Sequence, residues 1–178
     1  MAKIITVGAG VQDVFLSQSD ALKPVCESPE HCFARLDLGA KADVNQIHFA
    51  TGGGATNAAV TFARQGHQAL FMGIIGKDPA GQAVLDDLDK EGVGTQLVKY
   101  SLKYSTGYSV LLLAPNGERT ILTYRGASTH YHPADFDISD QKADWLYVST
   151  LSGNMDVLNK LFRQARDQGI KICFNPGK

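Results

Sequence analysis

The sequence lacks the excess of positive charge that a nucleic-acid-binding protein carries. Its 178 residues hold 17 lysines and arginines against 18 aspartates and glutamates, for a formal net charge of −1 at pH 7. Because nucleic acid is bound largely through basic side chains, a nucleic-acid partner is disfavoured. Long apolar runs are also missing, since none approaches the roughly 20 residues that a membrane-spanning helix needs. We therefore expect a cytoplasmic chain with neither a nucleic-acid nor a membrane partner.

Cysteine is scarce, and its spacing does not fit a metal site. The chain has three cysteines, Cys26, Cys32 and Cys173, an odd number without the short pairs typical of zinc ligands. Thiols scattered in this way predict reduced cysteines in a cytoplasmic protein. His130 and His132 alternate in a loop-like stretch and bring no third ligand. We predict no metal ligands in this chain.

What is present is a rhythm of strand, helix and strand. The hydrophobic fraction of 44% and the charged fraction of 20% are ordinary for one globular domain of this length. Apolar runs of strand length alternate with stretches of helical periodicity, which predicts an α/β fold with a mostly parallel sheet. The expected strands are 3–7, 69–75, 145–149 and 170–174, and the expected helices are 56–65, 79–91 and 155–168.

Two regions break this rhythm and predict a second, smaller sheet. Residues 33–49 contain two alternating runs, FARLDL and VNQIHF, and residues 106–113 and 119–124 flank the Asn-Gly turn signal of a hairpin. We expect these four strands, within about 33–50 and 106–125, to form an antiparallel sheet growing from the main one. Its open edges and apolar side chains predict a dimer interface. The apolar residues are Phe33, Leu36, Ile47, Phe49, Val110 and Leu112.

The segment 51–76, TGGGATNAAVTFARQGHQALFMGIIG, is the most informative in the chain. Its glycine run opens a helix, so a ligand can approach the backbone closely and meet unpaired N–H groups. The Lys-Ser/Thr pair of a Walker loop is absent, which makes this loop a poor nucleotide site. We expect it to hold substrate hydroxyls through the N–H groups of Gly53 and Gly54 and the side chain of Asn57. The alternatives are a tight turn and an asparagine that caps the helix.

Asp13 lies shortly after the first strand, in the run GAGVQD. A dinucleotide fingerprint would need a third glycine where Asp13 stands, and a carboxylate there would repel a pyrophosphate. A Rossmann-type oxidoreductase is therefore disfavoured. A carboxylate at the end of a parallel strand suits the hydroxyls of a polyol instead, although a capping or turn aspartate is the alternative. We expect Asp13 and Asn57 to converge on one pocket between the two sheets.

Two further residues are singled out at the ends of elements. Arg125 stands where the hairpin returns to the core, followed by Gly126-Ala127-Ser128. It either meets a phosphate on a phosphorylated sugar or is an exposed, charged strand end, and the residues leave both readings open. Asp78 precedes Pro79 at the start of a helix, and we expect it to cap that helix and not to act as a catalyst.

Taken together, these motifs resemble the first sequence signature of the ribokinase-like (PfkB) carbohydrate kinases. The positions that fill the signature are Gly52, Gly53, Asn57, Ala59, Gly66 and Gly76. The resemblance runs from VGAGVQD to FNPGK and implies a ribokinase-like three-layer core with a β lid over the sugar. It further implies transfer of the ATP γ-phosphoryl, with Mg²⁺, to a hydroxyl of a sugar or nucleoside. It gives Asp13 the role of sugar-binding aspartate and makes the lid the interface of a homodimer.

The resemblance also implies what this chain does not hold. The family's second signature, Asp-Thr-x-Gly-Ala-Gly-Asp, carries the catalytic aspartate and an anion hole, and we expect it beyond Lys178. The chain would then be the substrate-binding half of a kinase without the ATP-binding half, and inactive alone. The alternative is a truncated, non-catalytic polyol-binding or interaction module. Leu151 stands where many family members have an acidic or amide residue, so the identity of the sugar or nucleoside stays open.

Overall fold

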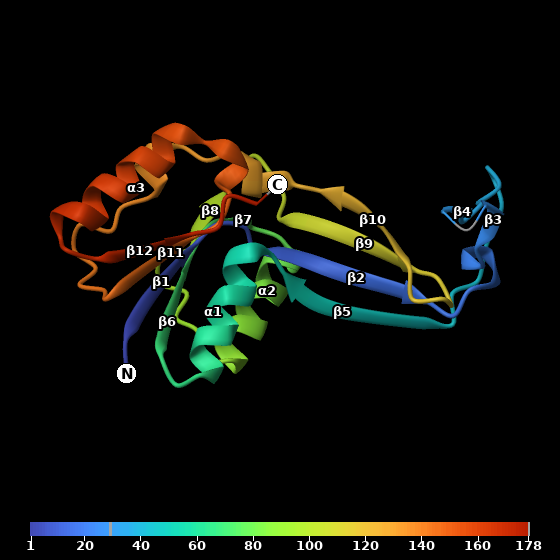
Figure 1. Cartoon of the computed structure of the whole chain (residues 1–178), viewed down its shortest axis with the longest axis horizontal. Helices are drawn as coiled ribbons and strands as arrows, with labels where there is room; N and C mark the ends of the chain where they lie inside the picture. Colours follow the sequence, from blue (N-terminus) through green and yellow to red (C-terminus); the bar gives the residue numbers. More distant parts are fainter. Residues whose placement is uncertain (29, 178) are drawn as a thin grey trace.

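A parallel sheet of four strands forms the centre of the molecule (Figure 1). The structure is a computed structural model that describes residues 1–28 and 30–177. The sheet has the order β12-β11-β1-β6, and each neighbouring pair is parallel. Its strands are β1 (Lys3–Val7), β6 (Gln68–Met72), β11 (Trp145–Val148) and β12 (Lys171–Phe174). The apolar runs of the sequence therefore become strands whose carboxyl ends lie at one edge.

Helices cover both faces of this sheet and give it three layers. The helices are α1 (Gly54–Arg64), α2 (Pro79–Lys90) and α3 (Met155–Asp167). On one face Val157 and Leu161 of α3 pack in a single cluster with Leu146 and Val148 of β11. On the other face, apolar residues of α1 and α2 pack with those of β6 in a second cluster. The expected α/β fold with a three-layer core is confirmed.

A second sheet projects from the core as a long ribbon (Figure 1). Its order is β10-β9-β2-β5, and we call it the lid. The lid strands are β2 (Val11–Ser17), β5 (Gln46–Gly52), β9 (Gly107–Leu113) and β10 (Arg119–Tyr124). The predicted hairpin of β9 and β10 is confirmed. The lid is mixed and not wholly antiparallel, because β2 runs parallel to β9.

The shorter elements complete the described part of the chain. Two small ribbons pair β3 (Val25–Ser28) with β4 (His31–Phe33) and β7 (Ile74–Gly76) with β8 (Lys99–Ser101). Short 3-10 helices span Asp20–Leu22, Gly126–Thr129, Pro133–Asp135 and Leu151–Gly153. In the described ranges no helix is both long and apolar enough to cross a membrane. The same ranges contain no group of three or more His, Cys, Asp or Glu residues that could hold a metal ion.

Two strand predictions were wrong. The alternating run FARLDL is not a strand, because β4 ends at Phe33 and the next five residues have no regular structure. Its place in the lid is taken by β2, which was not predicted as a strand. In β2, Val14 is buried while Asp13 is only partly buried. The run 69–75 also divides, at Gly73, into β6 and β7. Gly73 passes so close to the Gly8 carbonyl that a Cβ would lie 2.5 Å from its oxygen.

The prediction of three reduced cysteines was also wrong. Cys26 of β3 lies opposite Cys32 of β4, with Cα atoms 4.0 Å apart, and the two form a disulfide. Cys173 is free and exposed. The pairing depends on a ribbon of two strands, neither of which was predicted, so cysteine spacing alone did not reveal it.

Candidate functional site

A cavity of about 270 Å³ lies where the lid meets the core. Ala9, Ser149 and Asn175 line it, and they follow three parallel strands, β1, β11 and β12. The start of α1 and three lid strands, β2, β9 and β10, supply other parts of the wall. A crevice at the carboxyl ends of parallel strands is the usual ligand site of an open α/β sheet. We therefore take this junction cavity as the candidate site.

Gly53 and Gly54 both line the junction cavity, at the start of α1. Gly53 has a φ of +114°, a backbone conformation that favours glycine, and a Cβ there would clash with the Ala9 carbonyl. Gly53 is also the N-cap of α1 and gives the helix no side-chain hydrogen bond. The N–H groups of the first turn are thus free of a capping side chain and can donate to oxygen atoms of a ligand.

Asp13 lies on the lid strand β2, beside the wall of the junction cavity. It pairs across the ladder with Ala50 of β5 and with Ser109 of β9, a residue that lines the cavity. Its carboxylate lies against Gly52, where a Cβ would clash with Oδ2. Burial raises the pKa of the Asp13 carboxyl, and a hydrogen bond from Ser109 opposes this only in part. A partly buried carboxylate held in this way can accept hydrogen bonds from ligand hydroxyls.

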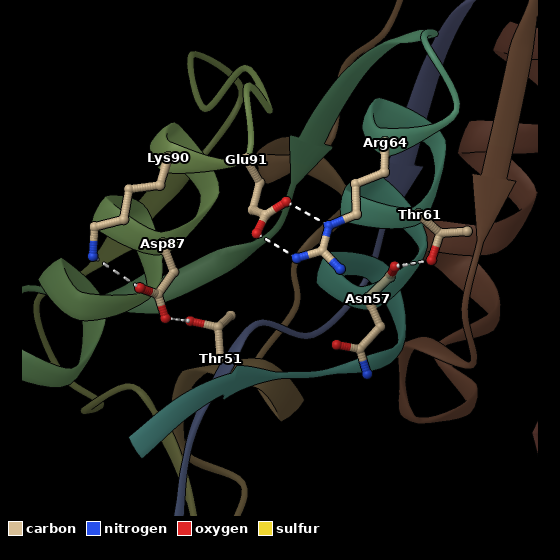
Figure 2. Close-up of polar contacts among 7 residues, drawn as sticks. All are labelled: Thr51, Asn57, Thr61, Arg64, Asp87, Lys90 and Glu91. Atoms are coloured by element: carbon tan, nitrogen blue, oxygen red, sulfur yellow. Dashed lines mark hydrogen bonds and ion pairs between the residues drawn. The ribbon is translucent and has the colours of Figure 1, made fainter. Parts of the chain in front are cut away.

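Asn57 does not lie on the junction cavity. It lines a separate groove of about 430 Å³ between α1, α2 and the end of β5. Figure 2 shows its side chain below Arg64 of the same helix, and both residues line the groove together with Thr51. Asp13 is among the lining residues of neither this groove nor the junction cavity, so its convergence with Asn57 on one pocket stays a prediction. Position in a helix sequence shows that Asn57 is in the first turn but does not show which neighbouring element that turn faces.

The groove beside Asn57 holds polar contacts that join the elements around it (Figure 2). Arg64 of α1 donates from Nε and Nη2 to the two carboxylate oxygens of Glu91, at 2.6 and 2.5 Å. Thr51 of β5 donates its hydroxyl to Asp87 of α2 at 2.8 Å. Hydrogen bonds from Arg64 hold the pKa of the Glu91 carboxyl below its usual range. These contacts fix α2 against α1 and against the lid.

Arg125 is exposed and lines the junction cavity from the lid side. It follows β10 directly and begins the tight turn that returns the chain to the core. Its carbonyl accepts hydrogen bonds from the N–H group of Ser128, at 3.1 Å, and from its hydroxyl, at 2.5 Å. The structure thus brings Arg125 to the same cavity as Gly53 and Gly54.

Several residues of the cavity were not predicted from the sequence. They carry hydroxyl or amide groups and are Ser109, Ser128, Ser149, Thr150, Ser152 and Asn175. Leu151 and Ser152 have φ of +47° and +54°, an uncommon backbone conformation for residues other than glycine. This turn buries Leu151 in the core and leaves its polar neighbours on the cavity. The hydroxyl-rich run STLSG after β11 was the available signal.

Asp78 caps α2, as predicted. Its Oδ1 accepts from the Gly81 N–H at 2.9 Å, and Pro79 occupies the first turn. Partial burial alone would raise the pKa of the Asp78 carboxyl, but hydrogen bonds from Thr106, Gly81 and Ser105 outweigh it and hold that pKa below its usual range. Asp78 does not line the junction cavity, so the structure gives it a structural role.

Comparison with curated proteins places the chain beside sugar kinases. It is 31% identical to a fructokinase of Vibrio alginolyticus over 130 residues, and 28% identical to a ribokinase of Schizosaccharomyces pombe over 136 residues. These alignments cover 70% and 72% of this chain but 42% and 43% of the two relatives. The chain therefore spans less than half the length of these relatives.

Solved structures give the same fold. The PfkB protein of Polaromonas sp. JS666 matches with a TM-score of 0.77 at 21% identity, over 100% of this chain and 56% of that one. The ATP-bound fructokinase of Xylella fastidiosa matches with a TM-score of 0.72 at 22% identity, over 97% of this chain and 51% of that one. A family model described as pfkB family carbohydrate kinase matches residues 28–177. The chain belongs to the pfkB family of carbohydrate kinases.

Proposed function

We propose that the junction cavity binds a sugar or related polyol whose hydroxyl receives the γ-phosphoryl group of ATP, with Mg²⁺ bound to the nucleotide. The observation that supports this most is the partly buried carboxylate of Asp13 beside the glycine-rich start of α1. Carboxylate oxygens accept hydrogen bonds from ligand hydroxyls, and free helix N–H groups donate hydrogen bonds to the oxygens of those hydroxyls. A polyol is a ligand that uses both. The names of the fructokinase and ribokinase relatives agree with this substrate class.

In this proposal, the described residues position the acceptor hydroxyl. Asp13 accepts from one or two hydroxyls, and the backbone N–H groups near Gly53 and Gly54 donate to others. Phosphoryl transfer depends mostly on such positioning and on neutralising charge. Because the chain spans 42% and 43% of the two relatives, we further propose that the catalytic aspartate and the ATP site belong to the remaining part of such a protein.

Titration of the isotope-labelled chain with fructose, ribose and adenosine tests the substrate site. We expect NMR shift changes at Asp13, Gly53, Gly54 and the strand ends around them. Changes confined to the groove beside Asn57, or none with any polyol, would contradict the proposed site. Incubation of the same chain with ATP, Mg²⁺ and each polyol tests whether the catalytic aspartate and the ATP site lie outside this chain. Turnover above the control without protein would show that the chain is catalytically complete.

The coverage of less than half of the relatives also favours a second candidate function, a polyol-binding or interaction module without catalysis. Both candidates predict polyol binding by this chain. Sequencing the gene downstream of the codon for Lys178 distinguishes the two candidate functions. An in-frame Gly-Ala-Gly-Asp motif supports the kinase, and a stop codon supports the module.

We also propose that the lid forms a homodimer. Ladder register places Ile47 and Phe49 of β5 on the face of the lid opposite Asp13, together with Val110 and Leu112 of β9. Ile47 and Phe49 are more than half exposed, and a second copy would bury them. Sedimentation equilibrium should report a dimer that Phe49→Asp converts to monomer. A monomer for the unaltered chain at high concentration would contradict this.

We place the proposed reaction in the cytoplasm, where ATP is available. The disulfide between Cys26 and Cys32 would then be open to reduction.

A further inference from the structure

Tyr131 and Ser149 bring two buried hydroxyls to the junction cavity. Both residues line the cavity, and they are only 7% and 6% exposed. Ser109 and Ser128, the other buried serines of the cavity, are hydrogen-bonded within the chain. In the ranges that the structure describes, neither the Tyr131 hydroxyl nor the Ser149 hydroxyl has a hydrogen bond to another residue. These two hydroxyls can therefore bond to a ligand.

Neither hydroxyl is sealed inside the protein. Within the described residues, every side-chain nitrogen or oxygen that solvent cannot reach has a hydrogen-bond partner. A hydroxyl without a partner must therefore touch space that solvent can enter, and the space that Tyr131 and Ser149 line is the junction cavity. Because a buried hydroxyl without a partner is unfavourable in the free protein, its presence at a cavity points to a ligand that completes its hydrogen bonds.

Tyr131 is held in place through both its ring and its backbone. The ring packs edge-on against Phe136, with the ring centroids 5.3 Å apart, in the apolar cluster that also contains residues of α3. The Tyr131 carbonyl accepts a hydrogen bond from Asn154 Nδ2 at 3.0 Å, and Asn154 also caps α3 by accepting from the Val157 N–H. The position of the Tyr131 hydroxyl is thus fixed by the core.

Ser149 is held at the carboxyl end of β11. Its N–H donates to the Val7 carbonyl at 2.9 Å, directly after Val148, the last residue of the strand. Gly8 leaves room for the side chain, because a Cβ there would overlap the Ser149 hydroxyl. A Cβ on Gly54, the first residue of α1, would lie 3.6 Å from the same oxygen. The Ser149 hydroxyl therefore lies beside the first turn of α1.

The two hydroxyls come from segments that pack together and are uncharged. Val148 and Leu151, on either side of Ser149 in the sequence, belong to the same buried cluster as Tyr131. Burial raises the pKa of the Tyr131 hydroxyl above its ordinary value, so the group stays protonated at neutral pH. Each hydroxyl can donate one hydrogen bond and accept others. Such a pair matches an uncharged oxygen, such as a hydroxyl of a polyol, and does not match an apolar substituent.

We propose that Tyr131 and Ser149 form a subsite that binds one hydroxyl of the polyol and rejects the analogue in which hydrogen replaces that hydroxyl. This inference rests on the proposed function for the polyol itself. When the parent polyol binds, both protein hydroxyls gain a partner. When the deoxy analogue binds, they lose solvent and gain no partner, so a site of this kind discriminates strongly against the missing oxygen.

Calorimetric titration with parent and deoxy ligands tests the proposal on the chain as it exists. The ligands are glucose, fructose and ribose, each with its set of monodeoxy analogues. For a polyol that binds, we expect removal of one particular hydroxyl to lower the affinity about 10- to 100-fold. Tyr131→Phe removes only the protein hydroxyl and should weaken binding of the parent about 3- to 10-fold, while affinity for that deoxy analogue stays the same or rises. Ser149→Ala should have the same effect.

Stability separates a binding role from a structural one. Because the Tyr131 hydroxyl has no partner among the described residues, Tyr131→Phe should keep or raise the melting temperature of the free chain. Tyr100→Phe is the matched control, because Tyr100 lies on β8, is exposed and is outside the junction cavity. It should leave both the affinity for the parent and the discrimination unchanged.

Equal affinity for the parent and all its deoxy analogues overturns the inference and leaves the proposed function intact. Discrimination that Tyr131→Phe or Ser149→Ala retains in full does the same. A lower melting temperature for Tyr131→Phe with unchanged affinity also overturns it, because the hydroxyl would then serve the fold. Binding of no polyol at all overturns both the inference and the proposed function.

Discussion

Asp78 and Thr106 join the start of α2 to the root of the lid. The Asp78 carboxylate accepts from the Thr106 N–H at 2.8 Å and from the Thr106 hydroxyl at 2.6 Å. The same hydroxyl accepts from the Gly76 N–H at 2.9 Å. Thr106 immediately precedes β9, and Gly76 ends β7. One buried threonine thus links a helix cap, a core strand and a lid strand, and so sets where the lid leaves the core.

Replacement of Asp78 should destabilise the fold. Asp78→Ala removes the cap of α2 and leaves the donors of Thr106 without their acceptor, so we expect the free energy of unfolding to fall by about 2 kcal/mol. Urea denaturation measures this. Asp89→Ala is the control, because Asp89 is exposed on the same helix, and its effect should stay below about 0.5 kcal/mol. Similar losses for the two variants would contradict a special role for Asp78.

The Asp78 contacts also predict a dependence of stability on pH. The pKa of Asp78 is lower in the folded protein than in the unfolded chain, so the unfolded state binds its proton more readily. Its contribution is therefore present above about pH 4 and is lost as the pH falls through the folded pKa. Between pH 5 and pH 2, the free energy of unfolding should fall less in Asp78→Asn than in the unaltered chain. Parallel losses would contradict this assignment.

Asp13 should contribute to binding at a cost in stability. Because burial raises its pKa, its contribution to stability is present below the unfolded pKa and lost as the pH rises through the folded pKa. At pH 7 the charged carboxylate is thus unfavourable in the folded state. Asp13→Asn should keep or raise the melting temperature while it weakens polyol binding by about 1.5–3 kcal/mol. A lower melting temperature with unchanged affinity would identify Asp13 as a structural residue.

Gly52 should act through Asp13. A Cβ on Gly52 would occupy the place of the Asp13 carboxylate, so Gly52→Ala should push that group aside and weaken polyol binding. In a double-mutant cycle, Gly52→Ala should cost little further affinity once Asp13→Asn is present, because both changes remove one interaction. Additive losses measured by calorimetry would show that Gly52 contacts the ligand independently.

Local pattern predicted the core well because its determinants are local. The helix that begins at Pro79 has its cap at Asp78 and its apolar face at helical spacing, and the structure bears out both. The strand at Lys3–Val7 is rich in β-branched residues, and its last four residues are buried. In such segments, the residues that begin the element, set its apolar periodicity and end it all lie within or next to the element.

The lid and the site were predicted less well, because their structure depends on contacts between segments that are distant in the sequence. The run 33–38 alternates as a strand does, yet no strand pairs with residues 34–38. The strand at Val11–Ser17 was missed because its first residues follow a glycine-rich turn, and its partners lie at Gln46–Gly52 and Gly107–Leu113. The groove that Asn57 lines is formed partly by α2, whose position cannot be read from the sequence of α1. Pattern gives the type of an element but not its neighbours.

The cysteines allow a direct chemical test. Because Cys26 and Cys32 form a disulfide, iodoacetamide should label only Cys173 in the folded, unreduced chain and all three cysteines after reduction. Mass spectrometry counts the labels. Cys26→Ser is the matched variant, and it should show two reactive thiols without reductant. Labelling of three thiols in the unreduced chain would contradict the disulfide.

Reduction should loosen the lid tip without unfolding the core. The β3–β4 ribbon lies at the far end of the lid from the parallel sheet (Figure 1), and neither of the two main apolar clusters contains its residues. The bridge closes a short loop, so opening it releases only local chain entropy. We expect limited proteolysis between Lys23 and Arg35 to accelerate on reduction while the melting temperature stays nearly constant. A large fall in melting temperature would mean that the tip supports the core, which would require contacts between β3–β4 and the main sheet.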